Sequence, residues 1–171
     1  VNGQSVGDGQ EIDLGGKTLR FLMAPFLHWP DTMFTYVPQD RLLLTCDAFG
    51  AHYCGASVFD DECEPFDEDF RVYYEGIMRP FRDYVLPAVA KIEPLAIDAI
   101  GPSHGPILRR DAWKKVNQYK AWATVPASAK PTVAVFYASA HGNTRRMVDA
   151  VVEGMTEAGA ETAVLHISEA D

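Results

Sequence analysis

The sequence is short of the features that mark several large classes of protein. Lysine and arginine number 15 against 24 aspartates and glutamates, which gives a net charge of -9. A nucleic-acid surface needs clustered basic side chains and is not expected here. No apolar run approaches the roughly 20 residues that span a bilayer. The three cysteines form no CxxC pair, which favours a reducing, cytoplasmic setting over a disulfide framework. We therefore expect small molecules, metals or other proteins as partners.

The remaining pattern predicts an α/β protein. Glycine pairs and turn residues between apolar segments predict two hairpins, formed by residues 10–14 with 17–24 and by residues 33–37 with 41–46. The apolar run at 42–46 predicts a strand buried on both faces. Helical spacing at 68–78 and 80–91 predicts two helices, the second kinked near Pro87. A strand at 96–100 and a helix at 111–122 follow.

Two further patterns concern surface and core. The acidic stretch 60–69 is interpreted as a solvated loop followed by a helix N-terminus. Several aromatic residues fall on the predicted helices and are expected to lie in the core. They are Tyr73, Tyr74, Phe81, Tyr84, Trp113, Tyr119 and Trp122.

The composition also predicts a domain boundary. Residues 123–131 are small, flanked by proline and without periodicity, as is typical of a linker. A new strand, helix and strand are expected at 132–137, 143–157 and 161–166. The predicted organisation is therefore one domain over 1–122 and the start of another over 132–171.

Three residues of metal-ligand type each follow an apolar strand. His28, Asp47 and His104 stand where the chain leaves the predicted sheet, so a rigid scaffold can direct them to one point. Imidazole and carboxylate suit iron, zinc or manganese, and a carboxylate can bridge two metals. A surface or hydrogen-bonded histidine is the alternative for each residue taken singly. His52 lies in the same loop as Asp47 and is assigned a nearby supporting or structural role.

A second group has the residue types of an anion-binding loop. The segment Ser139-Ala140-His141-Gly142-Asn143-Thr144 connects a predicted strand to a helix start. Its hydroxyls, amide, unhindered backbone N–H groups and helix dipole favour a monophosphate. The lysine of nucleotide triphosphatases and the GxGxxG of dinucleotide folds are absent. A serine-capped helix with a tight glycine turn is the alternative.

The segments 27–34, 47–50 (Asp-Ala-Phe-Gly) and 101–106 (Gly-Pro-Ser-His-Gly-Pro), followed by the 139–144 loop, resemble those of flavodiiron proteins. The resemblance implies the C-terminal part of a metallo-β-lactamase-like αβ/βα sandwich, followed by the first β-α-β of a flavodoxin-like doubly wound domain. It implies a non-haem site with two iron ions, in which His28 and His104 each bind one iron and Asp47 bridges both. It also implies FMN held by residues 139–144.

The activity implied by this resemblance is reduction of O2 to water or of NO to N2O, with electrons delivered through FMN. Implied partners are rubredoxin or a flavoprotein reductase, and a second copy in a head-to-tail dimer. The family's His-x-Glu-x-Asp ligand cluster has no counterpart here, and no histidine precedes His28. We therefore expect a piece of a larger protein, short at both ends and inactive alone. A hydrolase of the same fold with an accessory flavodoxin-like domain is the alternative.

Overall fold

The chain divides into two units, Val1–Thr124 and Val125–Asp171. The computed structural model describes residues 3–124 and 130–167. Most of the predicted linker lies at 125–129, outside the described residues. The domain limits 1–122, 123–131 and 132–171 stay predictions.

The first unit contains a five-stranded mixed sheet in the order β1-β2-β3-β4-β5. Its strands are β1 (Glu11–Asp13), β2 (Thr18–Met23), β3 (Met33–Val37), β4 (Leu42–Leu44) and β5 (Ala99–Gly101). Neighbouring strands are antiparallel except β4 and β5, which are parallel. Both predicted hairpins are present. Gly15 and Gly16 have φ of 78° and 145° in the first turn, a backbone conformation that favours glycine.

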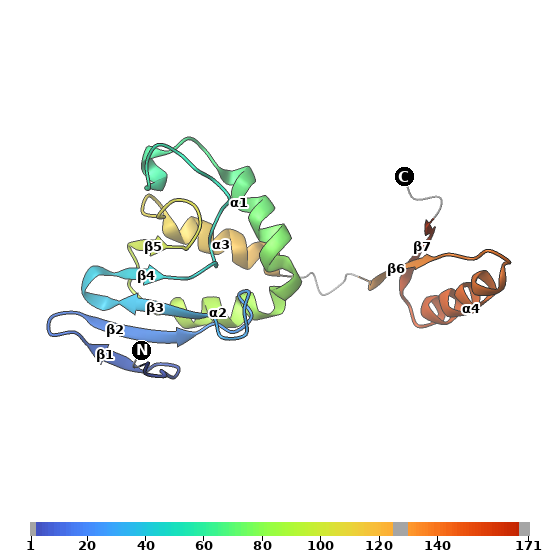
Figure 1. The fold of residues 1–171 in the computed structure, drawn as a ribbon, viewed down its shortest axis with the longest axis horizontal. Coiled ribbons are helices and arrows are strands. Elements are labelled where there is room, and N and C mark those ends of the chain that lie inside the picture. The colour runs from blue at the N-terminus through green and yellow to red at the C-terminus, as the bar shows by residue number, and fades with distance from the viewer. Residues whose placement is uncertain (1–2, 125–129, 168–171) are drawn as a thin grey trace. The chain divides into compact units, whose positions relative to one another are not determined.

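One face of this sheet forms the core. Leu22, Phe34, Tyr36, Leu43 and Ile100 alternate with residues of the other face and join one buried cluster with the helices. Those helices are α1 (Asp67–Tyr73), α2 (Val85–Ile92) and α3 (Ala112–Ala123), and they lie on one side of the sheet (Figure 1). The side chain of Asp111 caps α3 by accepting the Lys114 N–H.

The prediction that the 42–46 strand is buried on both faces was wrong. Leu43 is fully buried, whereas Leu44 is 42% exposed and points to the opposite face. There it lines an open groove with Met33 and Thr35. Apolar sequence alone does not reveal which face of a strand is covered.

The predicted helix pair also needs correction. A π-helical turn, Tyr74–Met78, follows α1, and a 3-10 segment, Arg79–Tyr84, precedes α2. The kink lies at Phe81, whose φ and ψ of -111° and 20° are not helical. Pro87 is the third residue of α2, in the first turn, where a missing N–H removes no helical hydrogen bond.

Part of the acidic stretch is paired and not simply solvated. Arg109 donates to Asp61 and Glu62, and Asp60 accepts the backbone N–H groups of Arg109 and Arg110. Three acidic residues do begin α1, as predicted.

The aromatic residues on these helices divide into three groups. Tyr73, Tyr74 and Tyr119 are buried, and Trp113 and Trp122 pack against the core, as predicted. Phe81 is half-buried. The core prediction was wrong for Tyr84, which is 40% exposed.

The second unit has the predicted order of elements. Strands β6 (Thr132–Tyr137) and β7 (Glu161–His166) pair in parallel, and α4 (Asn143–Glu157) connects them. Gly159, at φ 87°, ends the helix turn. Throughout residues 3–124 and 130–167, every helix is too short or too polar to cross a bilayer.

Candidate functional site

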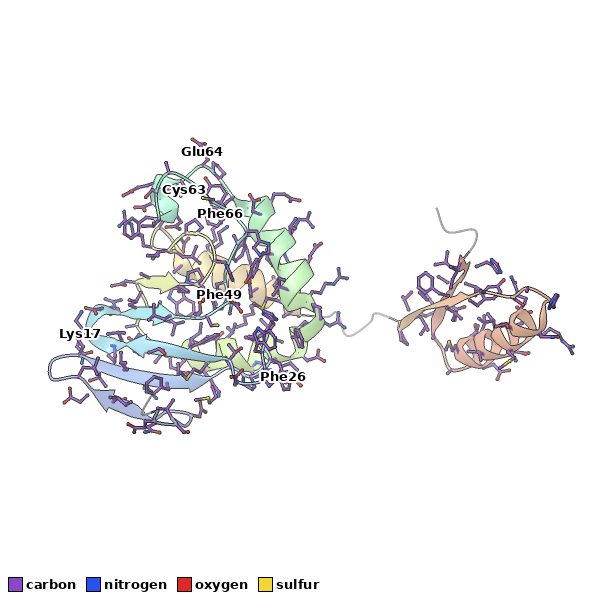
Figure 2. All side chains as sticks on the ribbon, in the orientation of Figure 1. Lys17, Phe26, Phe49, Cys63, Glu64 and Phe66 are labelled. Carbon is purple, nitrogen blue, oxygen red and sulfur yellow. The ribbon has the colours of Figure 1, made fainter. Side chains whose placement is uncertain are left out.

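Three strands bring the predicted metal ligands to one edge of the sheet. Because β2 is antiparallel to β3, and β3 to β4, the strands β2, β4 and β5 run in the same direction. Leu44 is paired with Gly101, and Asp47 and His104 lie three residues beyond these partners. His28 follows the end of β2. Figure 2 shows Phe26, two residues before His28, at the opposite end of the sheet from the hairpin residue Lys17.

The three side chains converge on the carboxylate of Asp47. His28 Nε2 lies 3.3 Å from Oδ2 of Asp47, and His104 Nε2 lies 3.4 Å from its Oδ1. Both distances are longer than a charge-assisted hydrogen bond between an imidazole and a carboxylate, about 2.7–2.9 Å. Asp47 is 9% exposed, so its charge is largely removed from water. Each imidazole thus faces a different oxygen of one buried carboxylate.

This placement fits metal binding in donor type and spacing. Two donors bound to one ion at about 2.1 Å and roughly 100° apart lie about 3.2 Å from each other. Each histidine–oxygen pair has nearly this separation. Within the described ranges, however, no group of three or more His, Cys, Asp and Glu side chains is arranged to hold a metal ion. The trio is therefore a partial donor set.

The loops that carry Asp47 and His104 pack against each other through their backbones. Ala51 N–H donates to the carbonyl of His104, and Ser103 N–H donates to that of Cys46. A Cβ on Gly105, whose φ is 80°, would lie 2.8 Å from the Ala51 carbonyl oxygen. A Cβ on Gly50 would lie 3.1 Å from the carbonyl oxygens of both Asp47 and His104. Glycine is required for this close approach.

The Asp47 loop holds side chains in an unfavourable backbone conformation. Cys46 and Phe49 have φ of 52° and 64°, in the left-handed region that costs of order 1–3 kcal/mol for residues other than glycine. Phe49 is buried against Phe34 and Tyr119, and the Thr45 hydroxyl donates to the Ala48 carbonyl. Core packing therefore fixes the loop.

Two further side chains lie beside the trio. Tyr73 contacts the ring of His52 edge-on at 4.7 Å between centroids and that of His104 at 6.1 Å. Burial raises the pKa of Tyr73 above its usual range, and the charge of Asp47 adds to the shift. His52 is exposed. The sequence analysis placed Tyr73 only in the core, because helical spacing does not indicate which loops a helix will contact.

The anion-binding loop lies between β6 and α4. Gly142, at φ 77°, is the N-cap of α4, and no side chain caps the first turn. The alternative of a serine-capped helix is therefore wrong. Residues 140–144 (Ala140, His141, Gly142, Asn143 and Thr144) are exposed. The Oγ of Ser139 is buried without a hydrogen-bond partner among the described residues. Uncapped N–H groups beside an orphaned hydroxyl fit a phosphate group.

The first unit thus has a mixed sheet with two histidines and one buried aspartate gathered at the ends of three strands. The model of the ODP family of beta-lactamases matches residues 4–105. The chain is 38% identical over 168 residues to diflavin flavoprotein A 1 of Synechocystis sp., covering 97% of this chain and 29% of that protein.

Two solved structures extend the comparison. The metal-soaked Flv1 flavodiiron core of Synechocystis superposes with a TM-score of 0.70 at 32% identity, covering 98% of this chain and 42% of that one. The rubredoxin oxygen:oxidoreductase of Desulfovibrio gigas gives 0.66 at 27% identity, covering 95% and 42%. The chain therefore belongs to the ODP beta-lactamase family, and its matches to flavodiiron proteins confirm the resemblance seen in the sequence.

Proposed function

We propose that this chain forms part of a flavodiiron oxidoreductase that reduces O2 to water, NO to N2O, or both. The observation that carries the proposal is the pair of imidazoles on separate oxygens of Asp47. The relatives are oxidoreductases and flavoproteins by name. Because the chain spans 29% of the diflavin relative, the activity and partners of the whole protein are part of this proposal.

At the proposed metal centre His28 and His104 would each hold one of two iron ions, and Asp47 would be shared between them. Further ligands come from residues beyond this trio, since three donors do not satisfy two metals. The Asp47 loop is fixed by Phe49 and by the Gly50 contact before any ligand arrives. The donors are therefore preorganised, and binding does not require the loop to refold.

The proposed flavin site uses the loop 139–144, in a flavodoxin-like domain that begins at residue 132. The Ser139 hydroxyl and the open first turn of α4 bind the FMN phosphate. Bound iron would supply the position for the diatomic substrate, and bound FMN would supply the electrons.

Two side chains of this chain, Tyr73 and His52, carry exchangeable protons beside the proposed metal centre. Reduction of O2 to water consumes one proton for each electron. The phenol of Tyr73 is neutral at pH 7, as for any tyrosine, and burial raises its pKa further, so it can donate a hydrogen bond. His52 is exposed and its ring touches Tyr73. His52 therefore lies between solvent and the ring of Tyr73 at the edge of the proposed centre.

The proposed partners follow from the surface beside His28. Trp29 is 61% exposed. Phe26 packs against Phe81 and against Tyr84, which is partly exposed. An exposed aromatic surface at a redox site suits a flavin or a protein partner. We assign it to the flavin-bearing unit of a second copy in a head-to-tail dimer. Rubredoxin or a flavoprotein reductase is the proposed electron donor.

The experiment that tests this function uses the protein as its gene encodes it. We expect bound iron, a bleachable flavin spectrum, and NADH-linked consumption of O2 or NO in the presence of a reductase. Asp47→Asn should lose about half or more of the iron, because the bridge serves both ions. Asp98→Asn is the matched control, since Asp98 is exposed and its carboxylate pairs with Arg41.

The same preparation distinguishes the reductase from the alternative, a hydrolase of this fold. A hydrolase of this fold would hold zinc, cleave an ester, lactam or thioester, and keep its activity without flavin. Iron with bleachable flavin and no hydrolysis supports the reductase. Zinc with hydrolysis and no flavin overturns it.

A further inference from the structure

The end of β7 lies beside the start of the anion-binding loop. His166 is the last residue of β7 and is paired in register with Tyr137, the last residue of β6. The two rings meet edge to face at 4.8 Å between centroids. The loop begins two residues after Tyr137, at Ser139. The imidazole is therefore held at the base of the loop by the pairing of the two strands.

Ser139 offers two donors, and His166 takes one of them. The Ser139 backbone N–H donates to His166 Nε2 at 3.3 Å. A ring nitrogen that accepts a hydrogen bond carries no proton, so this contact places the proton of the neutral imidazole on Nδ1. The Ser139 hydroxyl is buried and unpaired within the described chain. Its backbone N–H is committed, and the hydroxyl is left for a ligand.

The first cation after the loop, Arg145, already has hydrogen-bond partners. Arg145, in the first turn of α4, donates to the Tyr137 hydroxyl at 2.6 Å and to the Asp149 carboxylate at 2.9 Å. Tyr137 thus contacts both His166 and Arg145, and the contacts join β6, β7 and α4 below the loop. The loop's own groups, and not Arg145, face an incoming anion.

We infer that His166 is a positioning residue for the phosphate loop: by accepting the Ser139 N–H it holds the Ser139 hydroxyl ready for the phosphate of the flavin. This inference rests on the proposed function, in which residues 139–144 bind FMN. His166 acts through Ser139 and does not itself touch the ligand. Its effect is therefore confined to ligands that carry a phosphate.

The test compares FMN with riboflavin, which has the same ring and no phosphate. His166→Leu removes the acceptor and should weaken FMN binding about fivefold, the effect of one lost hydrogen bond. Riboflavin binding should not change. His166→Gln retains an acceptor on its side-chain amide and should restore most of the FMN affinity. Leu165→Gln, at the neighbouring 40% exposed position, is the matched control and should bind both ligands normally.

The outcomes separate this inference from the function on which it rests. Equal losses for FMN and riboflavin in His166→Leu would show a general structural role and overturn the inference. Unchanged FMN binding in that variant, or no recovery with His166→Gln, also overturns it. If the unsubstituted protein binds neither ligand, the proposed flavin function fails, and the His166 inference fails with it.

Discussion

The close approach at Gly105 gives the sharpest prediction about the candidate metal centre. Alanine at this position meets two penalties. Its φ of 80° lies in the left-handed region, which costs about 1 kcal/mol for alanine relative to glycine. Its Cβ would also lie 2.8 Å from the Ala51 carbonyl oxygen, so backbone must move, at roughly 2 kcal/mol more. We expect Gly105→Ala to reduce the free energy of unfolding by about 3 kcal/mol.

Gly15 provides the matched control for this prediction. Its φ is 78°, and nothing lies within 4 Å of a Cβ built on it. Gly15→Ala therefore has the dihedral penalty without the contact and should cost about 1 kcal/mol. Urea unfolding followed by tryptophan fluorescence reports on the first unit, because Trp29, Trp113 and Trp122 all lie there.

The difference between the two variants measures the contact itself. Because Ala51 N–H also donates to the His104 carbonyl, a shift at this contact displaces His104, and Gly105→Ala should lose bound iron while Gly15→Ala keeps it. Equal costs for the two variants would refute the close approach of the loops. A stability loss without any loss of iron would refute the connection between this approach and the metal ligands.

Four other substitutions test the charges and the backbone of the first unit. The hydrogen bond from Lys91 lowers the pKa of Asp8 in the folded protein. Ionised Asp8 therefore stabilises the fold above its unfolded pKa, and this stability is lost as pH falls through the folded pKa. Asp8→Asn should accordingly flatten the acid limb of a curve of unfolding free energy against pH. Lys115 is 8% exposed and pairs with Asp67. Asp67→Asn leaves this buried cation without its carboxylate and should lower the stability to thermal unfolding by about 1 kcal/mol or more. Lys115→Met removes the charge itself and should lower it less. Cys46→Gly should relieve the φ of 52°. It should raise the free energy of unfolding by about 0.5 kcal/mol, once the larger entropy of glycine in the unfolded chain is subtracted, and so raise the urea midpoint. A lower midpoint contradicts the strain.

The convergence of the candidate ligands could be predicted because it depends on strand direction alone. His28, Asp47 and His104 follow strands that hairpins and a crossover orient the same way, and the structure brings all three together. Their role as ligands, and that of residues 139–144 at FMN, stay predictions. The elements of the second unit were also predictable, since each begins within two residues after a proline or glycine.

What the sequence did not reveal depends on contacts between distant residues. Pro87 carries the usual signal for a kink, but its place in the first turn of α2 makes it harmless, and the break lies at Phe81. The apolar residue Leu44 is half-exposed because no described element covers its face. Tyr73 was assigned only to the core and Gly50 entered only as part of the 47–50 segment, because their contacts with the site arise only where the Asp47 and His104 loops meet.

The distribution of backbone strain indicates that the site around His28 and Asp47 has a function. Four residues other than glycine have positive φ among the described residues: Phe26, Arg41, Cys46 and Phe49. Three of them lie within two residues of His28 or Asp47. At about 1–3 kcal/mol each, their sum is comparable with the roughly 5–15 kcal/mol that stabilises a whole domain. A loop needed only to connect strands would relieve such a cost with glycine or asparagine. Here the strained residues are kept, and burial of Phe49 offsets their cost. Such a loop is expected where the direction of the Asp47 carboxylate must be fixed.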